Sequence, residues 1–157
     1  MKAMGKLLAS AKNQKWLNKK IGKHSRRDLL VIASLLHDNA KPSTCIKNKD
    51  KTTKCPSHEL LGAFLFGKYL KDSDLSKKDS DFVKHIIFYH GYAHDSVRDC
   101  LLKPSSKKRI LELFHKITKP YSEELILLTM ADTMGSDSIK LKPEEYGKKM
   151  EFCRKLL

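Results

Sequence analysis

The stretch Leu35-Leu36-His37-Asp38-Asn39-Ala40-Lys41-Pro42 places a histidine and a carboxylate side by side, directly after an apolar run. The run repeats apolar residues at one-, three- and four-residue intervals, which is the pattern of a buried helix. Its members are Leu29, Leu30, Ile32, Ala33, Leu35 and Leu36. Pro42 prevents the helix from continuing. We therefore expect His37 and Asp38 at the point where a core helix enters a loop, where both side chains are placed to bind a divalent cation.

Three further polar groups stand at the ends of predicted apolar helices. His58 lies in the first turn of a helix that begins at Pro56 and Ser57 and continues to Tyr69. His90 ends a helix predicted over 78–90, because Gly91 follows it. Asp132 interrupts the apolar run of a helix that begins at Ser122. If these helices form a bundle, the side chains can converge on one cavity.

The rest of the chain also favours helices. The remaining predicted elements are a helix over 3–21 ended by Gly22, a loop over 42–56, a short helix over 93–102, a helix after Pro104 and a last helix over 143–157. The pattern shows no strand and no internal repeat. We therefore predict an all-α fold, a compact helical bundle.

The 157 residues suit one domain over 1–157 with a core large enough to fold without disulfides. No secretion signal and no apolar segment of membrane-spanning length is present, so we expect a cytoplasmic protein without a membrane partner. The four cysteines are scattered, which favours reduced thiols. An alternative is a structural zinc site formed by Cys45, Cys55 and His58, although their spacing fits no tight knuckle.

The chain is strongly basic, with 32 Lys and Arg against 18 Asp and Glu and a formal charge of +14. Positive charge is dense at Lys19-Lys20, at Arg26-Arg27 and over 47–54. Such a charge attracts phosphates of nucleotides, nucleic acids or anionic surfaces. We therefore regard Arg26, Arg27 and the lysines of 47–54 as candidates for binding a polyanionic substrate, with a merely solvated surface as the alternative.

Four short blocks, taken in order, resemble the HD-domain superfamily of metal-dependent phosphohydrolases. They span about two thirds of the chain and are Leu-Leu-His-Asp-Asn-Ala-Lys-Pro at 35–42, Ser-His-Glu-Leu-Leu-Gly-Ala at 57–63, Ile-Ile-Phe-Tyr-His at 86–90 and Met-Ala-Asp-Thr-Met-Gly at 130–135. The second block and the Lys-Pro of the first are most similar to the HD domains of CCA-adding tRNA nucleotidyltransferases and their phage and viral relatives.

The resemblance implies a site with one or two divalent ions, of manganese, magnesium, iron, nickel, cobalt or zinc. His37 and Asp38 would ligate metal, with Asp38 able to bridge two ions. His58 and His90 would serve the second ion, and Asp132 would complete the first site. Asp38 and Lys41 would act in catalysis, with Lys41 contacting a substrate phosphate.

The chain departs from the family pattern at two positions. The family has a further histidine some thirty residues before the His-Asp pair, whereas this chain has none there and His24 is too close. Gln14 or a water is the alternative ligand. Ala40 stands where the family has glycine, which eases a left-handed turn at the end of a helix.

The predicted function is hydrolysis of a phosphomonoester or phosphodiester of a nucleotide or nucleic acid, including a cyclic phosphate. The main alternative is a catalytically silent nucleic-acid-binding module, which the absent histidine favours. A third is a regulatory protein that binds signalling nucleotides. The sequence does not indicate an oligomeric state.

Overall fold

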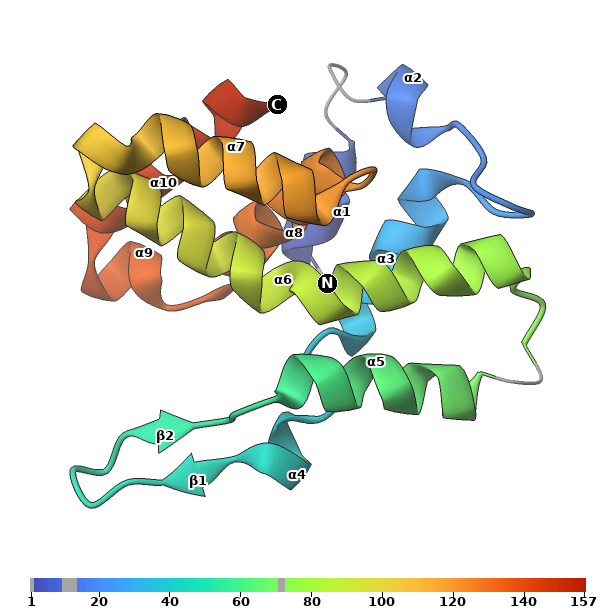
Figure 1. Ribbon diagram of the computed structural model, residues 1–157, viewed down its shortest axis with the longest axis horizontal. Helices are drawn as coiled ribbons and strands as arrows, with labels where there is room; N and C mark the ends of the chain where they lie inside the picture. Colours follow the sequence, from blue (N-terminus) through green and yellow to red (C-terminus); the bar gives the residue numbers. More distant parts are fainter. Residues whose placement is uncertain (1, 10–13, 71–72) are drawn as a thin grey trace.

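The computed structural model describes residues 2–9, 14–70 and 73–157, and almost all of its regular structure is helical (Figure 1). The helices are α1 (Lys2–Leu8), α2 (Gln14–Leu17), α3 (Arg26–Leu36), α4 (Lys41–Thr44), α5 (His58–Tyr69), α6 (Lys77–Leu102), α7 (Lys107–Thr118), α8 (Ser122–Gly135), α9 (Ser138–Leu141) and α10 (Pro143–Leu156), with a 3-10 turn at Pro104–Ser106. The predicted all-α class is confirmed.

Helix α6 is the element on which the bundle is built, because α3, α5, α7, α8 and α10 all pack against it. Its first turn is fixed by a capping box in which Ser76 and Asp79 bond each other's backbone N–H groups. Its buried side includes Phe82, Ile86 and Ile87. Burying side chains of this size stabilises the fold by about 1.5–3 kcal/mol each.

Helix α6 runs through Gly91 without a break, so the prediction of a helix ending at His90 and a separate helix over 93–102 is wrong. Gly91 allows close packing between helices and does not end α6. A Cβ atom at this position would lie 2.2 Å from Oε1 of Glu59, and one at Gly62 would lie 2.9 Å from Oδ1 of Asn39. The two glycines thus let α5 lie close to α6 and to the end of α3.

The predicted single helix over 3–21 is also wrong, because α1 ends at Leu8 and α2 covers only Gln14–Leu17. The two helices bury separate apolar side chains, Met4 and Leu8 on α1 and Leu17 on α2. Helix α1 packs against α3 and α8, and this places its lysines near the C-terminal ends of both helices.

The predicted loop over 42–56 contains the short helix α4 and an antiparallel hairpin, so the expectation of no strand is wrong here. Strand β1 (Ile46–Lys47) pairs with β2 (Thr53–Lys54). Just beyond the pair Ile46 and Lys54, a disulfide joins Cys45 to Cys55, whose Cα atoms are 4.0 Å apart. The hairpin register brings these two cysteines together, which their distance in the sequence does not reveal.

The disulfide corrects two predictions about the cysteines. Reduced thiols are found at Cys100 and Cys153, which are free and buried, but not at Cys45 and Cys55. A zinc site formed by Cys45, Cys55 and His58 is excluded in this structure, because the two sulfur atoms are bonded to each other.

Helix α8 is the most deeply buried of the described helices, with every residue from Leu125 to Ala131 buried. Although α8 is strongly apolar, no helix in the described part of the chain is both long and apolar enough to cross a membrane. The helix ends near the metal-ligand candidates and carries Asp132 to them.

Candidate metal centre

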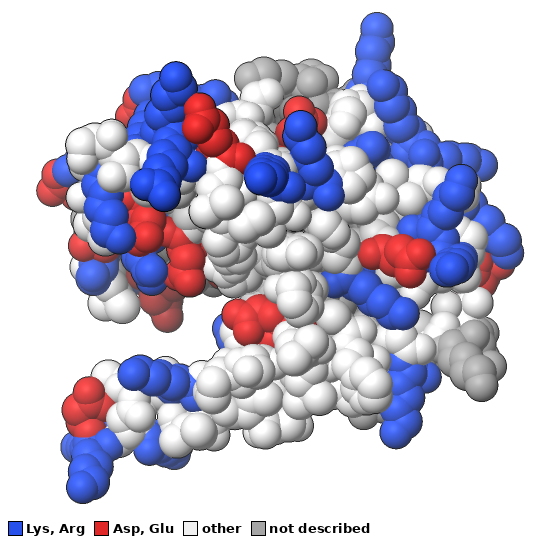
Figure 2. All heavy atoms as spheres, in the orientation of Figure 1, with Lys and Arg blue, Asp and Glu red and all other residues white. Residues whose placement is uncertain are grey.

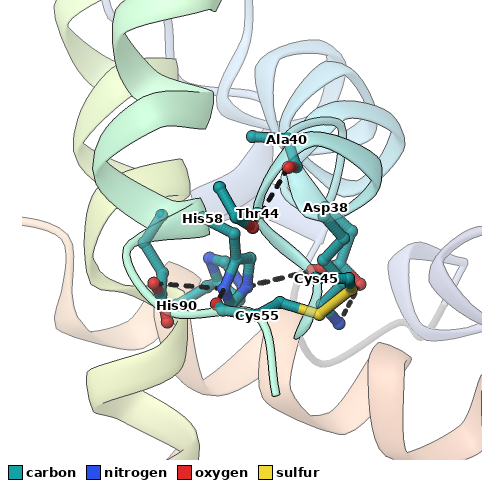
Figure 3. The surroundings of a disulfide bond; sticks show 9 residues. Asp38, Ala40, Thr44, Cys45, Cys55, His58 and His90 are labelled. Carbon is teal, nitrogen blue, oxygen red and sulfur yellow. Dashed lines mark hydrogen bonds and ion pairs between the residues drawn. A yellow bond between two sulfur atoms is a disulfide. The ribbon is translucent and has the colours of Figure 1, made fainter. Parts of the chain in front are cut away.

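The candidate metal ligands converge from four helical segments. The end of α3 supplies His37 and Asp38, the start of α5 supplies His58, the middle of α6 supplies His90, and α8 supplies Asp132. The Asp38 carboxylate lies at the centre: its oxygens are 3.3 Å from Nε2 of His37, 3.4 Å from Nε2 of His58 and 3.5 Å from Nε2 of His90. Figure 3 shows Asp38, His58 and His90 pointing toward one another.

The three imidazoles at this centre are oriented in the same way. Each places Nδ1 within hydrogen-bond distance of a backbone carbonyl: His37 at 3.1 Å from Ser34, His58 at 2.8 Å from Cys55 and His90 at 2.6 Å from Ile87. A carbonyl oxygen only accepts, so Nδ1 carries the proton and the neutral ring has its lone pair at Nε2. This is the tautomer that metal-bound histidines adopt when their other nitrogen donates to a carbonyl.

Several of the converging atoms lack a hydrogen-bond partner. Nε2 of His58 faces Nε2 of His90 at 3.2 Å, so two lone pairs oppose each other in the neutral rings. Nε2 of His37 and Oδ1 of Asp38 are buried without a hydrogen-bond partner. Buried polar atoms of this kind need a partner. A bound cation would supply such a partner. Two groups of side chains are close enough to hold one: His37, Asp38 and His90, and His58, Glu59 and His90.

The electrostatics of the centre also favour a cation. Burial lowers the pKa of His37, but the Asp132 and Asp38 carboxylates outweigh it and raise that pKa to about 9. Burial raises the pKa of Asp38, but the neighbouring His37 and His90 imidazoles and the Lys41 ammonium hold it far below its usual range. The pKa of Asp132 is also lowered, first of all by His37. The site thus attracts positive charge where Nε2 of His37 faces two carboxylates.

Lys41 also lies in the centre, because its Nζ is 2.7 Å from Oδ2 of Asp38. Ala40, which precedes it, is right-handed with φ −92°, so the chain does not make the left-handed turn for which a glycine would be needed. The alanine therefore does not disturb the placement of Lys41. Its predicted contact with a substrate phosphate stays a prediction.

The structure does not bring Arg26 and Arg27 to the centre, and their contact with a substrate stays a prediction. They begin α3, whereas His37 follows its last residue, about 15 Å away along the helix axis. The guanidinium of Arg26 pairs with the buried Glu124 and lies over the ring of Trp16. It compensates a buried carboxylate and is a structural residue.

Sequence reasoning missed Glu59. It treated His94 as a surface or loop residue, with a further ligand as the alternative, whereas both residues lie at the centre. Oε2 of Glu59 lies 3.2 Å from Nδ1 of His58. Nε2 of His94 lies 3.3 Å from Oδ2 of Asp132, and Nδ1 of His94 is 3.1 Å from Nζ of Lys149. An ammonium group only donates, so Nδ1 of His94 accepts and its Nε2–H points at Asp132.

His94 therefore has the opposite tautomer to the three candidate ligands and orients a carboxylate instead of binding an ion. The signal for it was its position four residues after His90 on one helix, which places both on the same face. His85, also a possible further ligand by sequence, is not at the centre: its Nε2 is 2.9 Å from the carbonyl of Thr118.

Two cavities lie on either side of Asp132. One, of about 430 Å³, includes His37 and is bordered by Lys2 and Lys6 of α1. The other, of about 740 Å³, includes His94 and Lys149. Both volumes are in the range of small-molecule sites. Substrate can therefore occupy space on both sides of this carboxylate.

The first cavity bears on the missing upstream histidine. Its described lining contains no histidine except His37, and α1 presents Lys2 and Lys6 there. His24 is elsewhere, with Nδ1 3.2 Å from the Asp79 carboxylate. The side chain of Gln14, the other substitute considered, lies outside the described residues.

A comparison with protein families gives a match to the model described as the HD domain over residues 6–136. The match includes every candidate ligand named above. No curated protein matches the chain.

Proposed function

This chain belongs to the HD-domain family, whose members are generally metal-dependent hydrolases, and we propose that it hydrolyses a phosphomonoester or phosphodiester of a nucleotide or nucleic acid. One or two divalent ions of the kinds named above would serve the reaction. A divalent cation supplies Lewis acidity and positive charge for such hydrolysis.

The observation that carries this proposal is the convergence of three Nε2 atoms on the Asp38 carboxylate, where Nε2 of His37 and Oδ1 of Asp38 are buried without a hydrogen-bond partner. His37, Asp38 and Asp132 would hold one ion. His58 and His90, with Asp38 and Glu59, would hold the second. The backbone carbonyls behind the imidazoles keep the rings in the ligating tautomer, so the site is organised before an ion binds.

The protein's own cations would bind the substrate phosphate. The ammonium of Lys41 is at the centre, and those of Lys2, Lys6 and Lys149 border the two cavities that meet at Asp132. Cations placed around a phosphoryl group offset the negative charge that its oxygens carry. Space on both sides of Asp132 suits a phosphodiester, which has a substituent on each side of phosphorus.

The alternative is a silent nucleic-acid-binding module, favoured by the lysines that border the first cavity in place of a further ligand. Metal content and hydrolysis of bis(p-nitrophenyl) phosphate, measured for the wild type and Asp38→Ala, distinguish the two. We expect bound metal and metal-dependent hydrolysis that Asp38→Ala abolishes. A wild type that binds no ion and hydrolyses nothing refutes the enzyme and favours the alternative.

A further inference from the structure

The hairpin 45–55, here called the lysine arm, carries positive charge that the proposed metal centre does not use. Its basic residues are all exposed and are Lys47, Lys49, Lys51 and Lys54. The one carboxylate, Asp50, accepts hydrogen bonds from the backbone N–H and the hydroxyl of Thr52, at 3.0 and 2.6 Å. In the part of the chain that the structure describes, no carboxylate pairs with these four lysines, whereas surface lysines such as Lys103 are paired.

The arm projects away from the helices. Figure 2 shows it as an extension with lysine side chains along it, separated from the body of the molecule by an open gap. In Figure 1 it leaves the molecule between α4, which follows Asp38 in the sequence, and α5, which begins at His58. Its charge is therefore accessible from the gap as well as from outside.

The base of the arm is attached to the metal centre on both strands. The backbone N–H of Cys45 donates to the carbonyl of Lys41 at 2.9 Å, and the carbonyl of Cys55 accepts from Nδ1 of His58 at 2.8 Å. The disulfide joins the two strands at this point, beside Asp38 in Figure 3. A polyanion whose phosphate reaches the centre can therefore continue along the arm.

The length of the arm selects among phosphate ligands. The chain runs outward from Cys45 for four residues to Lys49, about 13 Å at 3.3 Å per residue, before the turn at Asn48–Lys51 reverses it. A single nucleoside monophosphate bound at Asp38 does not reach that far, whereas about four nucleotides of a strand do, at 3.4 Å each. The side chains of His58 and His90 are only 12% and 6% exposed, so a phosphate reaches them from a flexible strand more easily than from a duplex.

We propose that the lysine arm binds the phosphate backbone of a single-stranded nucleic acid, which makes polynucleotides, and not free nucleotides, the substrate class of the metal centre. The inference about the substrate rests on the function proposed above, but the binding does not. The arm has no aromatic residue on which a base could stack. Binding should therefore be insensitive to base sequence and strongly dependent on salt.

The test compares two matched variants with the wild type. One replaces the four arm lysines, as Lys47→Gln, Lys49→Gln, Lys51→Gln and Lys54→Gln. The control replaces four exposed lysines of α6 and α7, as Lys77→Gln, Lys78→Gln, Lys108→Gln and Lys116→Gln, and so removes the same charge. Binding of a fluorescein-labelled 12-nucleotide oligothymidine is measured by anisotropy in EDTA at several salt concentrations. Charge reversal by Lys49→Glu with Lys51→Glu is a second variant, and helical circular dichroism verifies folding.

Four phosphate contacts correspond to a salt slope of about −3 and to between two and three decades of affinity at 0.1 M salt. We expect the arm variant to lose this slope and affinity and the control to keep most of both. With metal added, kcat/KM for the 12-mer relative to a dinucleotide should fall in the arm variant only.

Equal oligonucleotide binding by the arm and control variants overturns the proposal. So does arm-dependent binding to phosphatidylserine vesicles without arm-dependent binding of the oligonucleotide, which identifies a membrane surface as the ligand. Because binding is measured without metal, a wild type that hydrolyses nothing refutes the proposed function and leaves this result unaffected.

Discussion

Asp38→Asn is the substitution that most directly tests the metal centre. It keeps the size of the side chain and removes the charge that faces the Nε2 atoms of His37, His58 and His90 at 3.3–3.5 Å. The Asn amide also supplies N–H donors where the wild type has acceptors only. We therefore expect the variant to fold without metal and to bind metal poorly.

The magnitude follows from linkage. An ion that binds only the folded state stabilises it by about 2.7 kcal/mol at 100 times its Kd. For a chain of this length each kcal/mol raises Tm by about 2–4 °C, so the wild type should gain about 5–11 °C. Loss of a group that hydrogen-bonds a metal ligand costs about 10–100-fold in metal affinity, and loss of a direct ligand should cost at least 100-fold. The gain then falls to about 0.4 kcal/mol, or about 1 °C.

Differential scanning fluorimetry of EDTA-treated protein measures this, with magnesium, manganese, cobalt, nickel, zinc and anaerobic iron(II) added in turn. Asp137→Asn is the matched control, because this carboxylate is 79% exposed and makes only a 3.9 Å contact with Lys140. It should retain the full metal-dependent rise. A wild type without a rise for any ion, or an equal rise in Asp38→Asn, refutes the assignment of the centre.

Three more substitutions test other parts of the structure. Lys149→Met removes the donor that fixes His94, so metal affinity measured by calorimetry should fall about 10-fold, with Lys149→Arg less affected. Asp79→Asn should lower the free energy of unfolding, measured with urea at pH 7, by about 3–5 kcal/mol, and this loss should shrink as pH falls below about 4. Burial raises the pKa of the Asp79 carboxyl, but the hydrogen bonds to it outweigh burial, so the pKa is lowered overall. Arg26→Met leaves the buried Glu124 carboxylate without its cation. It should lower the free energy of unfolding by about 3 kcal/mol and leave KM unchanged.

The sign of the pH effect at Asp79 follows from the folded state. The carboxylate accepts hydrogen bonds from the backbone N–H groups of Gly22, Lys23 and Ser76 and is fully buried. Its pKa is therefore lower when folded than when unfolded. The stabilisation is present in full above the unfolded pKa and is lost as pH falls toward the folded one. A cost that stays constant from pH 7 to pH 3 contradicts this assignment.

The placement of the candidate ligands was accessible from sequence because each follows or interrupts an apolar helical run. The period of the run before His37 and the apolar stretch before Asp132 predict buried helices, and polar groups at the ends of buried helices meet when the helices pack. Glycine was a poor guide to the same helices. Gly91 was interpreted as a terminator, although its role is to admit Glu59, and that contact depends on a helix 32 residues earlier.

Features that depend on pairing between residues far apart in the sequence could not be predicted from the sequence. Arg26 and Glu124 are 98 residues apart, so nothing local distinguishes that arginine from a substrate-binding one. The hairpin lacks the alternation of apolar and polar residues that marks a strand, and its disulfide depends on the register. The same register turns a basic segment, ambiguous in sequence, into a fixed arm beside the metal centre. The sequence alone shows how many lysines the segment carries, but not where they lie. The structure fixes them next to His58, and this position makes polynucleotide binding by the arm a specific inference.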